Sequence, residues 1–445
     1  MGPKILKITV NGIKNINEPV VVDFSNQVIK NGLKKIVNVK GIYGTNGTGK
    51  TAFITAMDIY KDICIAKNYL LQDTNIIKLD KLINFITKSM FIEVVFSFDN
   101  QINRIYKHSL NIEKRNGEYI VSEEIISKLD ARSLNDNYIE LIHLINGKPN
   151  EHIYLDDLKD SLSKNQSFLS VYFDCLIGTK SEKPLKMTDN DLHLKLLILS
   201  IIQIETFLLD SDKHSEYFEK MDKIKIQANN DSSIKEEVVD SLFRSIGKND
   251  YLTYIDSLPG SELVLKEQYD EYKSFLEKMT LFIKIFKPSL KSIEPNIKSY
   301  REYYIVSKEF VYEDLPGSID YEFESAGIKN LVSLFGCLMN CAEGGISFID
   351  EMDTNINSVS FNKLIEFFLK YGEGQLCFTS HNMDSLDLLK NVNKGINFFG
   401  IDGSIESWTQ QGNKSPKNSF ETGRIINNPM NIESFDFLRV FGNEE

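Results

Sequence analysis

The chain has 445 residues, enough for about two to four compact domains or for one large domain with an inserted subdomain. It carries 51 Lys and Arg against 63 Asp and Glu, and the resulting net charge of −12 argues against a protein that wraps nucleic acid through charge alone. Hydrophobic residues make up 42% of the chain and charged residues 26%, so disordered, collagen-like and disulfide-scaffold proteins are excluded.

Residues 1–130 are predicted to form the first half of an α/β domain. Residues 4–24 show the alternation of two strands joined by an Asn-Gly turn, and residues 35–42 predict a third strand that enters a glycine-rich loop. Helical apolar spacing follows over residues 51–64. Residues 91–126 are rich in β-branched and aromatic residues between turn signals, which predicts an antiparallel meander.

The rest of the chain divides into three parts. Amphipathic stretches and polar loops over residues 131–285 predict a helical insertion, too irregular for a coiled-coil arm, that forms a compact partner-binding lobe. Residues 286–410 return to a mixed α/β pattern that completes the first domain. Residues 411–445 predict a polar loop and a C-terminal tail. The expected fold class is α/β, with a mixed central sheet, an antiparallel β subdomain and this insertion.

Cysteine usage and hydropathy indicate a cytoplasmic protein. The five cysteines show no CxxC spacing, which fits a reducing compartment, and we assign no metal to Cys337 and Cys341, whose spacing predicts packing on one helix face. The N-terminus alternates polar and apolar residues and lacks the apolar core of a signal peptide. The most apolar run, residues 192–209, contains charged residues, so we expect a buried helix and no membrane association.

The strongest motif is GTNGTGKT, residues 44–51, a full match to GxxxxGK[ST] between a predicted strand and a predicted helix. Its glycines let consecutive backbone N–H groups surround a phosphate, and the helix N-terminus adds donors and a favourable dipole. An ordinary glycine-rich turn is disfavoured by the flanking elements. The residues predicted to bind nucleotide are Asn46, Gly47, Thr48, Gly49, Lys50 and Thr51, with Lys50 on the β- and γ-phosphates and the Thr51 hydroxyl on Mg²⁺.

A second acidic motif has the form of a Walker B strand. The apolar run ISFI ends in Asp350 and Glu351, which suit a Mg²⁺-binding carboxylate and a base that orients or deprotonates the attacking water. A merely solvated acidic pair is the alternative, and the P-loop in the same chain makes it less favoured.

Two further motifs lie near these. Ser325 and Gly327 open a predicted helix, where Ser325 is either a helix N-cap or, with the unobstructed Gly327, a contact for a γ-phosphate held by another subunit. His381 follows a predicted strand in the sequence TSHN. A lone histidine is more often structural, but this position also allows a hydrogen bond to the γ-phosphate.

The order of these motifs, with MDTN after Walker B, resembles the ATPase heads of the ABC superfamily. More narrowly, residues 1–130 and 290–410 resemble the AAA-type, ABC-like ATPases related to the SMC, RecF and OLD proteins, particularly the AbiL-type ATPases of bacterial abortive-infection and anti-phage systems. The opening ILKITVNGIKNI, the hairpin YKHSLNIE…GEYIVSEEI and the signature ESAGIKNL carry this narrower resemblance.

The resemblance implies a mechanism and partners. Lys50 and Thr51 take Walker A roles, Asp350 and Glu351 Walker B and catalytic-base roles, and His381 the role of a catalytic switch histidine. Ser325 and Gly327 act in trans in a homodimer, or a higher oligomer, that sandwiches ATP and Mg²⁺. The chain departs from the family in its SAGIK signature and in the lack of an assignable Q-loop glutamine; Gln72 and Gln101 are candidates by position only.

Two functions follow from this resemblance. The first is a sensor or regulatory ATPase of an anti-phage system, which controls a separate effector, a nuclease or toxin, by ATP-dependent dimerisation, since the sequence carries no TOPRIM-like acidic cluster of its own. The alternative is a RecF- or SMC-like DNA clamp in repair or maintenance, for which Lys30, Lys34, Lys35 and Lys40 form a possible phosphate contact. A solvated basic edge is the favoured interpretation of these four lysines. Nothing in the sequence supports a transporter motor.

Overall fold

A computed structural model describes the protein over the following residues: 2–25, 28–29, 32–33, 36–99, 101–130, 137–149, 161–178, 190–208, 261–301, 303–409 and 414–425. The strands and helices of its first part are β1 (Pro3–Asn11), β2 (Val20–Asp23), β3 (Val28–Ile29), β4 (Gly32–Leu33), β5 (Val39–Tyr43), α1 (Lys50–Ile65), η1 (Tyr69–Leu71), α2 (Asp73–Leu82), β6 (Ser89–Phe98), η2 (Ile102–Arg104), β7 (Ile105–Arg115), β8 (Glu118–Leu129), β9 (Tyr138–Ile145), β10 (Lys148–Pro149), α3 (Phe168–Gly178), α4 (Asp191–Ile202) and β11 (Ile204–Phe207).

The second part begins at residue 261. Its elements are β12 (Ser261–Leu265), η6 (Lys266–Gln268), α7 (Tyr269–Phe286), β13 (Leu290–Tyr300), β14 (Tyr303–Tyr312), β15 (Ser318–Asp320), η7 (Tyr321–Phe323), α8 (Ala326–Ala342), β16 (Ile346–Ile349), α9 (Ser358–Tyr371), β17 (Gln375–Thr379), α10 (Ser385–Leu389), β18 (Ile396–Phe399), β19 (Ile405–Ser407) and α11 (Pro416–Glu421). Among the helices described here, none is long and apolar enough to cross a membrane.

Two sheets carry the main body. A seven-stranded sheet has the order β10-β9-β8-β7-β6-β1-β2 with every neighbouring pair antiparallel, and it contains the strands expected over residues 4–24 and 91–126. A six-stranded sheet has the order β11-β16-β17-β5-β18-β19, parallel except for β19. In this mixed sheet β17 lies between β5 and β16, so the carboxyl ends of all three meet at one edge.

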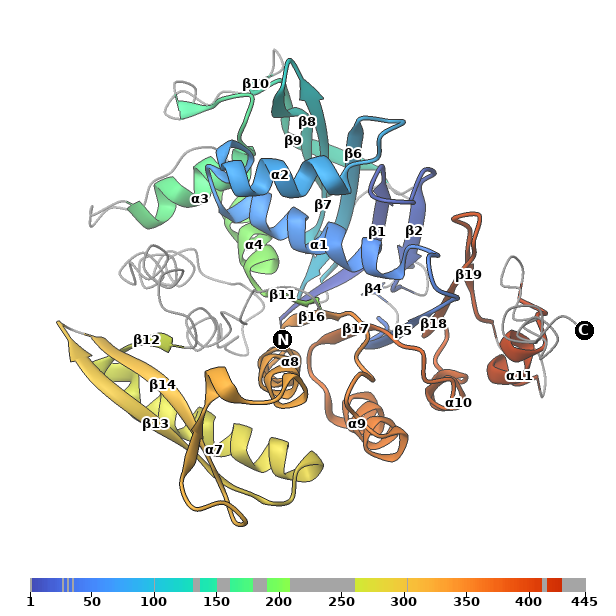
Figure 1. The fold of residues 1–445 in the computed structure, drawn as a ribbon. Helices are drawn as coiled ribbons and strands as arrows, with labels where there is room; N and C mark the ends of the chain where they lie inside the picture. Colours follow the sequence, from blue (N-terminus) through green and yellow to red (C-terminus); the bar gives the residue numbers. More distant parts are fainter. Residues whose placement is uncertain are drawn as a thin grey trace, which may run out of the picture.

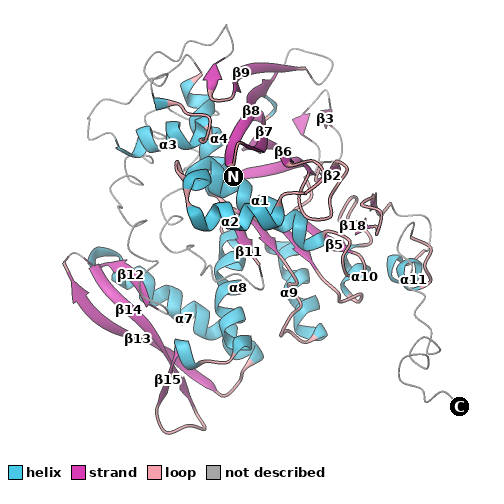
Figure 2. Cartoon of the chain, turned by 45° about the horizontal axis from the view of Figure 1, so that its top comes forward, coloured by secondary structure: helices cyan, strands magenta, loops and turns pink. Residues whose placement is uncertain are grey.

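The strands of the mixed sheet face two hydrophobic cores, because successive side chains of a strand point to opposite faces. Ile42 and Phe348 belong to the first core, which lies between the two sheets around α1. Tyr43 and Ile349, their chain neighbours, belong to the second core, which is covered by α8, α9 and α7. In Figure 1, α1 and α2 lie over the antiparallel sheet, and in Figure 2 α8 and α9 lie on the far side of the mixed sheet.

The described part of residues 131–285 is not purely helical, which corrects the expected helical insertion. Strands β9 and β10 extend the antiparallel sheet, and β11 forms the edge of the mixed sheet by pairing Ile204 with Ile346. The apolar run from residue 192, expected as one helix, is helix α4 followed by β11. Periodicity cannot separate a buried helix from a buried strand, and here the open edge of β16 provides backbone partners. The domain division at residues 130, 285 and 410 stays an interpretation of the sequence.

Smaller elements complete the fold. Strands β12 to β15 form a separate sheet that packs with α7 as a lobe beside α8 (Figure 2). The polar loop expected from residue 411 contains α11, because Ser415 accepts a hydrogen bond from the Asn418 amide and Pro416 occupies the first helical turn. The tail expected at the C-terminus lies outside the described residues.

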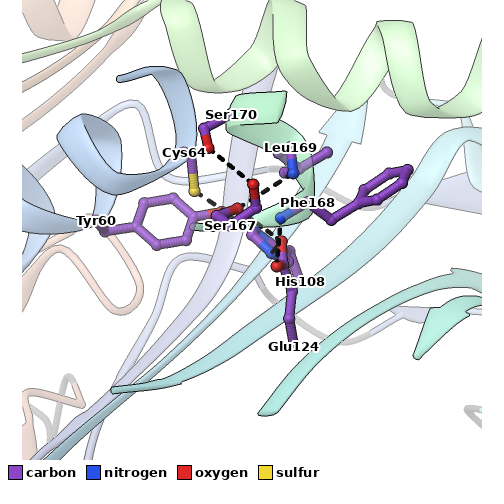
Figure 3. Close-up of polar contacts among 8 residues, drawn as sticks. All are labelled: Tyr60, Cys64, His108, Glu124, Ser167, Phe168, Leu169 and Ser170. Carbon is purple, nitrogen blue, oxygen red and sulfur yellow. Dashed lines mark hydrogen bonds and ion pairs between the residues drawn. The ribbon is translucent and has the colours of Figure 1, made fainter. Parts of the chain in front are cut away.

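A buried polar network joins α1 to the antiparallel sheet and to α3 (Figure 3). The Glu124 carboxylate on β8 accepts hydrogen bonds from the Ser167 hydroxyl (2.8 Å), the Phe168 amide (2.7 Å) and His108 Nε2 (3.1 Å). His108 Nδ1 is thereby left to accept the Tyr60 hydroxyl of α1 at 2.8 Å. Glu124 therefore links β7, β8, α1 and α3. Because its carboxylate is fully buried, water cannot take over its hydrogen bonds.

We expect Glu124→Ala to lower the free energy of unfolding by roughly 3 kcal/mol, because the buried donors of Ser167, Phe168 and His108 lose their acceptor. Urea unfolding followed by circular dichroism measures this change. The control is Glu123→Ala at the neighbouring exposed position, which pairs with His143 at the surface and should cost less than about 1 kcal/mol. Equal losses for the two variants would contradict the structural role given to Glu124.

Candidate active site

The P-loop connects β5 to α1 in a conformation that requires glycine. Gly47 and Gly49 have φ angles of 82° and 102°, in the left-handed region, and Gly49 is the N-cap of α1. A Cβ at Gly44 would lie 2.6 Å from the Phe399 carbonyl oxygen, so β18 packs directly on the start of the loop. The exposed Asn46 and Gly47 form its tip.

Lys50 is buried and lies back over its own loop. Its Nζ donates hydrogen bonds to the carbonyl oxygens of Gly44 (2.8 Å) and Thr45 (3.0 Å). Burial lowers the pKa of Lys50, although the nearby carboxylates of Asp350 and Glu351 act in the opposite direction. The structure therefore places the Walker A lysine within electrostatic reach of both Walker B carboxylates.

The two other predicted side chains of the loop differ in exposure. Thr48 is buried, and its hydroxyl donates to the Thr45 carbonyl at 3.0 Å, which closes the loop on itself. Thr51, at the start of α1, is exposed. The Thr51 side chain is therefore accessible to a ligand, whereas Thr48 supports the loop.

The Walker B carboxylates follow β16. Asp350 is buried, and Glu351 has a φ of 47°, an unusual value for a residue other than glycine. The Thr354 hydroxyl lies 3.4 Å from Glu351 Oε2 and is its local polar neighbour.

Thr379, which our sequence analysis missed, holds both Walker B residues. Its hydroxyl donates to Asp350 Oδ1 at 2.6 Å and accepts the Glu351 amide at 2.7 Å. The signal in the sequence was present but weak: a threonine ends the buried strand LCFT, and only the strand order places that end beside β16.

His381 lies two residues beyond Thr379 and is exposed. Its amide lies 3.3 Å from Asp353 Oδ1, which ties the histidine loop to the residues that follow Walker B. The structure thus brings His381 to the edge of the sheet that carries Lys50, Asp350 and Glu351.

Ser325 and Gly327 are separate from this group. The Ser325 hydroxyl accepts the Ile328 amide at 3.3 Å, so the serine is the N-cap of α8. A Cβ on Gly327 would have Asn355 Oδ1 as its nearest neighbour, at 3.6 Å. Ser325 is exposed, and its remaining hydrogen bonds go to Glu324 and Lys329. Within one chain Ser325 therefore acts as a helix N-cap, and its contact with a nucleotide on another subunit remains a prediction.

The donor set suits Mg²⁺. A hard cation of this size takes one or two protein oxygens and completes its shell with water and phosphate. The Thr51 hydroxyl and the Asp350 carboxylate provide such oxygens at the two motif ends. In the ranges described above, no cluster of three or more His, Cys, Asp or Glu forms an all-protein metal site.

Other residues singled out in the sequence have different roles. Lys40 is fully buried, where its Nζ donates to Asn397 Oδ1 at 2.7 Å and burial lowers its pKa to about 8. Lys40 is therefore unavailable to a DNA phosphate, and Lys30, Lys34 and Lys35 lie outside the described side chains. Gln72 precedes α2 and accepts a hydrogen bond from Asn75, so it stays unassigned.

Comparison with known proteins gives likeness to solved structures only. No family model and no curated protein matches the chain. The similar structures include an SMC head bound to the C-winged helix domain of ScpA (12% identity, 93% of this chain and 99% of that chain, TM-score 0.43). A second is the Pyrococcus furiosus SMC head with an extended coiled coil bound to the C-terminal domain of ScpA (14% identity, 95% of this chain and 99% of that chain, TM-score 0.43). A third is the Thermotoga maritima SMC head (13% identity, 92% of this chain and 100% of that chain, TM-score 0.30). Likenesses this low assign no function.

Thr379→Val removes the hydroxyl but keeps the shape of the side chain. We expect the ATP turnover indicated by the motifs to fall about 10- to 100-fold, because a hydrogen bond to a charged group is lost, while ATP binding is retained. Thr379→Ser restores the hydroxyl and should restore most of the turnover. Phosphate release and binding of a fluorescent ATP analogue measure the two properties, and equal turnover by the Val and Ser variants would contradict the role of the hydroxyl.

Proposed function

We propose that this chain is an ABC-like ATPase that binds ATP and Mg²⁺ at its P-loop and hydrolyses ATP to ADP and phosphate. The supporting observation is the arrangement at one edge of the mixed sheet, where β5 leads into the P-loop that holds the buried Lys50 and β16, two strands away, ends in Asp350 and Glu351. A buried lysine on a glycine-rich loop binds phosphates, and an adjacent pair of carboxylates serves metal and water.

In this proposal the loop amides of residues 46–49 and the N-terminus of α1 bind the β-phosphate. The Gly44 and Thr45 carbonyl oxygens hold the Lys50 ammonium at the loop. When ATP binds, Lys50 exchanges these carbonyl partners for phosphate oxygens. Thr51 and Asp350 would hold Mg²⁺, which would supply positive charge to neutralise the phosphate oxygens. Glu351 accepts a proton from the water that attacks the γ-phosphorus, as the bond to the β,γ-bridging oxygen breaks. His381 lies at the same edge and donates to the γ-phosphate.

The proposed assembly is a homodimer with nucleotide between its subunits. Within one chain Ser325 makes only local hydrogen bonds at the start of α8, and it is exposed. Figure 1 shows α8 beside the lobe of α7 and β12–β15, whereas α1 lies over the antiparallel sheet. A second copy could therefore supply Ser325 and Gly327 to the nucleotide on the first.

For the cellular role, the proposal is a cytoplasmic sensor or regulatory subunit of an anti-phage system that controls a separate effector. Its support is the motif resemblance alone, from residues 44–51 to residues 379–382. The DNA-clamp alternative has lost one of its candidate contacts, because Lys40 is buried. Adjacent nuclease or toxin genes would favour defence, and adjacent repair genes would favour the clamp.

Glu351→Gln tests the ATPase and the dimer together. We expect turnover to fall about 100-fold or more, because the amide cannot accept the water proton, while ATP binding persists. With ATP and Mg²⁺ the variant should accumulate as an assembly larger than the apo protein in light scattering. The wild type, which turns nucleotide over, should accumulate less of it.

The matched control is Glu366→Gln on the exposed side of α9, where the carboxylate pairs with Lys363 at the surface. It should leave turnover and mass unchanged. Normal hydrolysis by Glu351→Gln would contradict the catalytic assignment, and a constant mass at all ATP concentrations would contradict the nucleotide-sandwiched dimer.

A further inference from the structure

Two exposed apolar features lie beside the two halves of the proposed nucleotide site. The first is the apolar tip, Phe85 and Ile86, whose side chains are 81% and 82% exposed. The second is next to the signature, where Phe323 is 82% exposed two residues before Ser325. Single exposed apolar side chains are ordinary on a protein surface, so exposure alone assigns no partner. What distinguishes these residues is their position beside the two halves of the proposed nucleotide site.

The apolar tip is held rigidly beside the P-loop. The Asn84 amide donates to the Gly12 carbonyl at 2.9 Å, and its side chain donates to the Lys14 carbonyl at 2.9 Å. Asn15, on the same loop, donates a hydrogen bond to the Gly47 carbonyl. A Cβ at Gly49 would lie 3.2 Å from Ile16 Cγ1. The loop of residues 12–17 therefore contacts the P-loop on one side and the base of the tip on the other.

The signature side is concave. A pocket of about 420 Å³ opens beside α8. Its apolar lining includes Tyr312, Leu315, Ile328 and Leu331, and Ser325 and Gly327 belong to the same wall. We call this the signature pocket. It also carries the carboxylates of Asp314 and Glu324 and the ammonium of Lys287, and the exposed residue two positions after the tip is Lys88. The two carboxylates outnumber the lysine, so the pocket has an acidic excess that suits an apolar tip with a basic residue beside it.

The tip and the signature pocket of one chain lie on different sides of the mixed sheet. Leu79 of α2, which precedes the tip, belongs to the core around α1. Leu331, which lines the pocket, belongs to the core on the other face. Figures 1 and 2 both show α2 well apart from α7, which ends at the pocket. The pocket of the same chain is thus not the partner of the tip.

We infer that Phe85 and Ile86 of one copy of this chain dock in the signature pocket of a second copy when nucleotide is bound between them. The inference rests on the proposed function, because the sandwich places the P-loop of one subunit opposite the signature of the other. The tip flanks the first and the pocket flanks the second, so they meet across the interface. In a two-fold dimer the contact forms twice and encloses both nucleotides.

Dimerisation in the Glu351→Gln background tests this contact. Phe85→Ser on the tip and Leu315→Ser in the pocket should each weaken ATP- and Mg²⁺-dependent dimerisation about 10-fold or more, measured as the concentration dependence of mass in light scattering. Ile139→Ser, an equally apolar exposed position on β9 of the antiparallel sheet, is the matched control and should leave dimerisation unchanged. Phe85 and Leu315 are exposed, so thermal unfolding should be unaffected by these substitutions.

Cross-linking locates the contact directly. Phe85→Cys protein mixed with Leu315→Cys protein should form a mixed disulfide dimer under a mild oxidant only when ATP and Mg²⁺ are present. Four of the natural cysteines are buried, and Cys175 is present in every variant and sets the background. Cross-linking without nucleotide at the same yield would overturn the inference.

The outcomes separate the two proposals. If Glu351→Gln dimerises with ATP and the two serine variants dimerise equally well, the docking contact is wrong and the ATPase dimer stands. If Phe85→Ser weakens ATP binding by the monomer at low protein concentration, the tip contacts the nucleotide instead of a second copy. If Glu351→Gln never dimerises, both the sandwich and the docking contact fail.

Discussion

Helix α1 buries a polar face as well as an apolar one, because both large sheets pack around it. All of its residues except Thr51, Asp62 and Ile65 are buried. Asp58 accepts a hydrogen bond from the Thr206 hydroxyl at 2.8 Å, and Lys61 pairs with Glu205 at 3.1 Å, so α1 is bound to β11. On the opposite side Tyr60 donates to the His108–Glu124 network. Since Lys50 is the first residue of this helix, these contacts also position the phosphate-binding loop.

The acidic half of the site depends on one hydroxyl between two strands. Asp350 and Glu351 end β16, and Thr379 ends the neighbouring strand β17 in parallel register. A single Thr379 oxygen contacts the carboxylate of the first residue and the amide of the second. The left-handed turn at Glu351 is thereby held by a tertiary contact rather than by local preference. Any displacement of β17 would therefore move both carboxylates and His381.

The proposed division of the site between two copies gives a use to three exposed apolar side chains near it. Phe85, Ile86 and Phe323 contribute nothing to the two cores, yet each lies next to one half of the proposed nucleotide site. Such residues raise the free energy of the monomer in water and lower it when buried in an interface. In the proposed dimer, nucleotide would form the polar centre of the interface and these apolar side chains would lie beside it.

Local patterns were sufficient to find β5, the P-loop and α1, the meander, β16 and the two Walker motifs, because these elements carry short-range signals of alternation, helical spacing and glycine placement. They were not sufficient for β11, since an apolar run reads the same as a helix or as a buried strand until β16 offers an unpaired edge. Nor could they assign Thr379 or the burial of Lys40. A single hydroxyl or ammonium group leaves no periodic signal in the sequence. Its role depends on which strands the sheet places beside it.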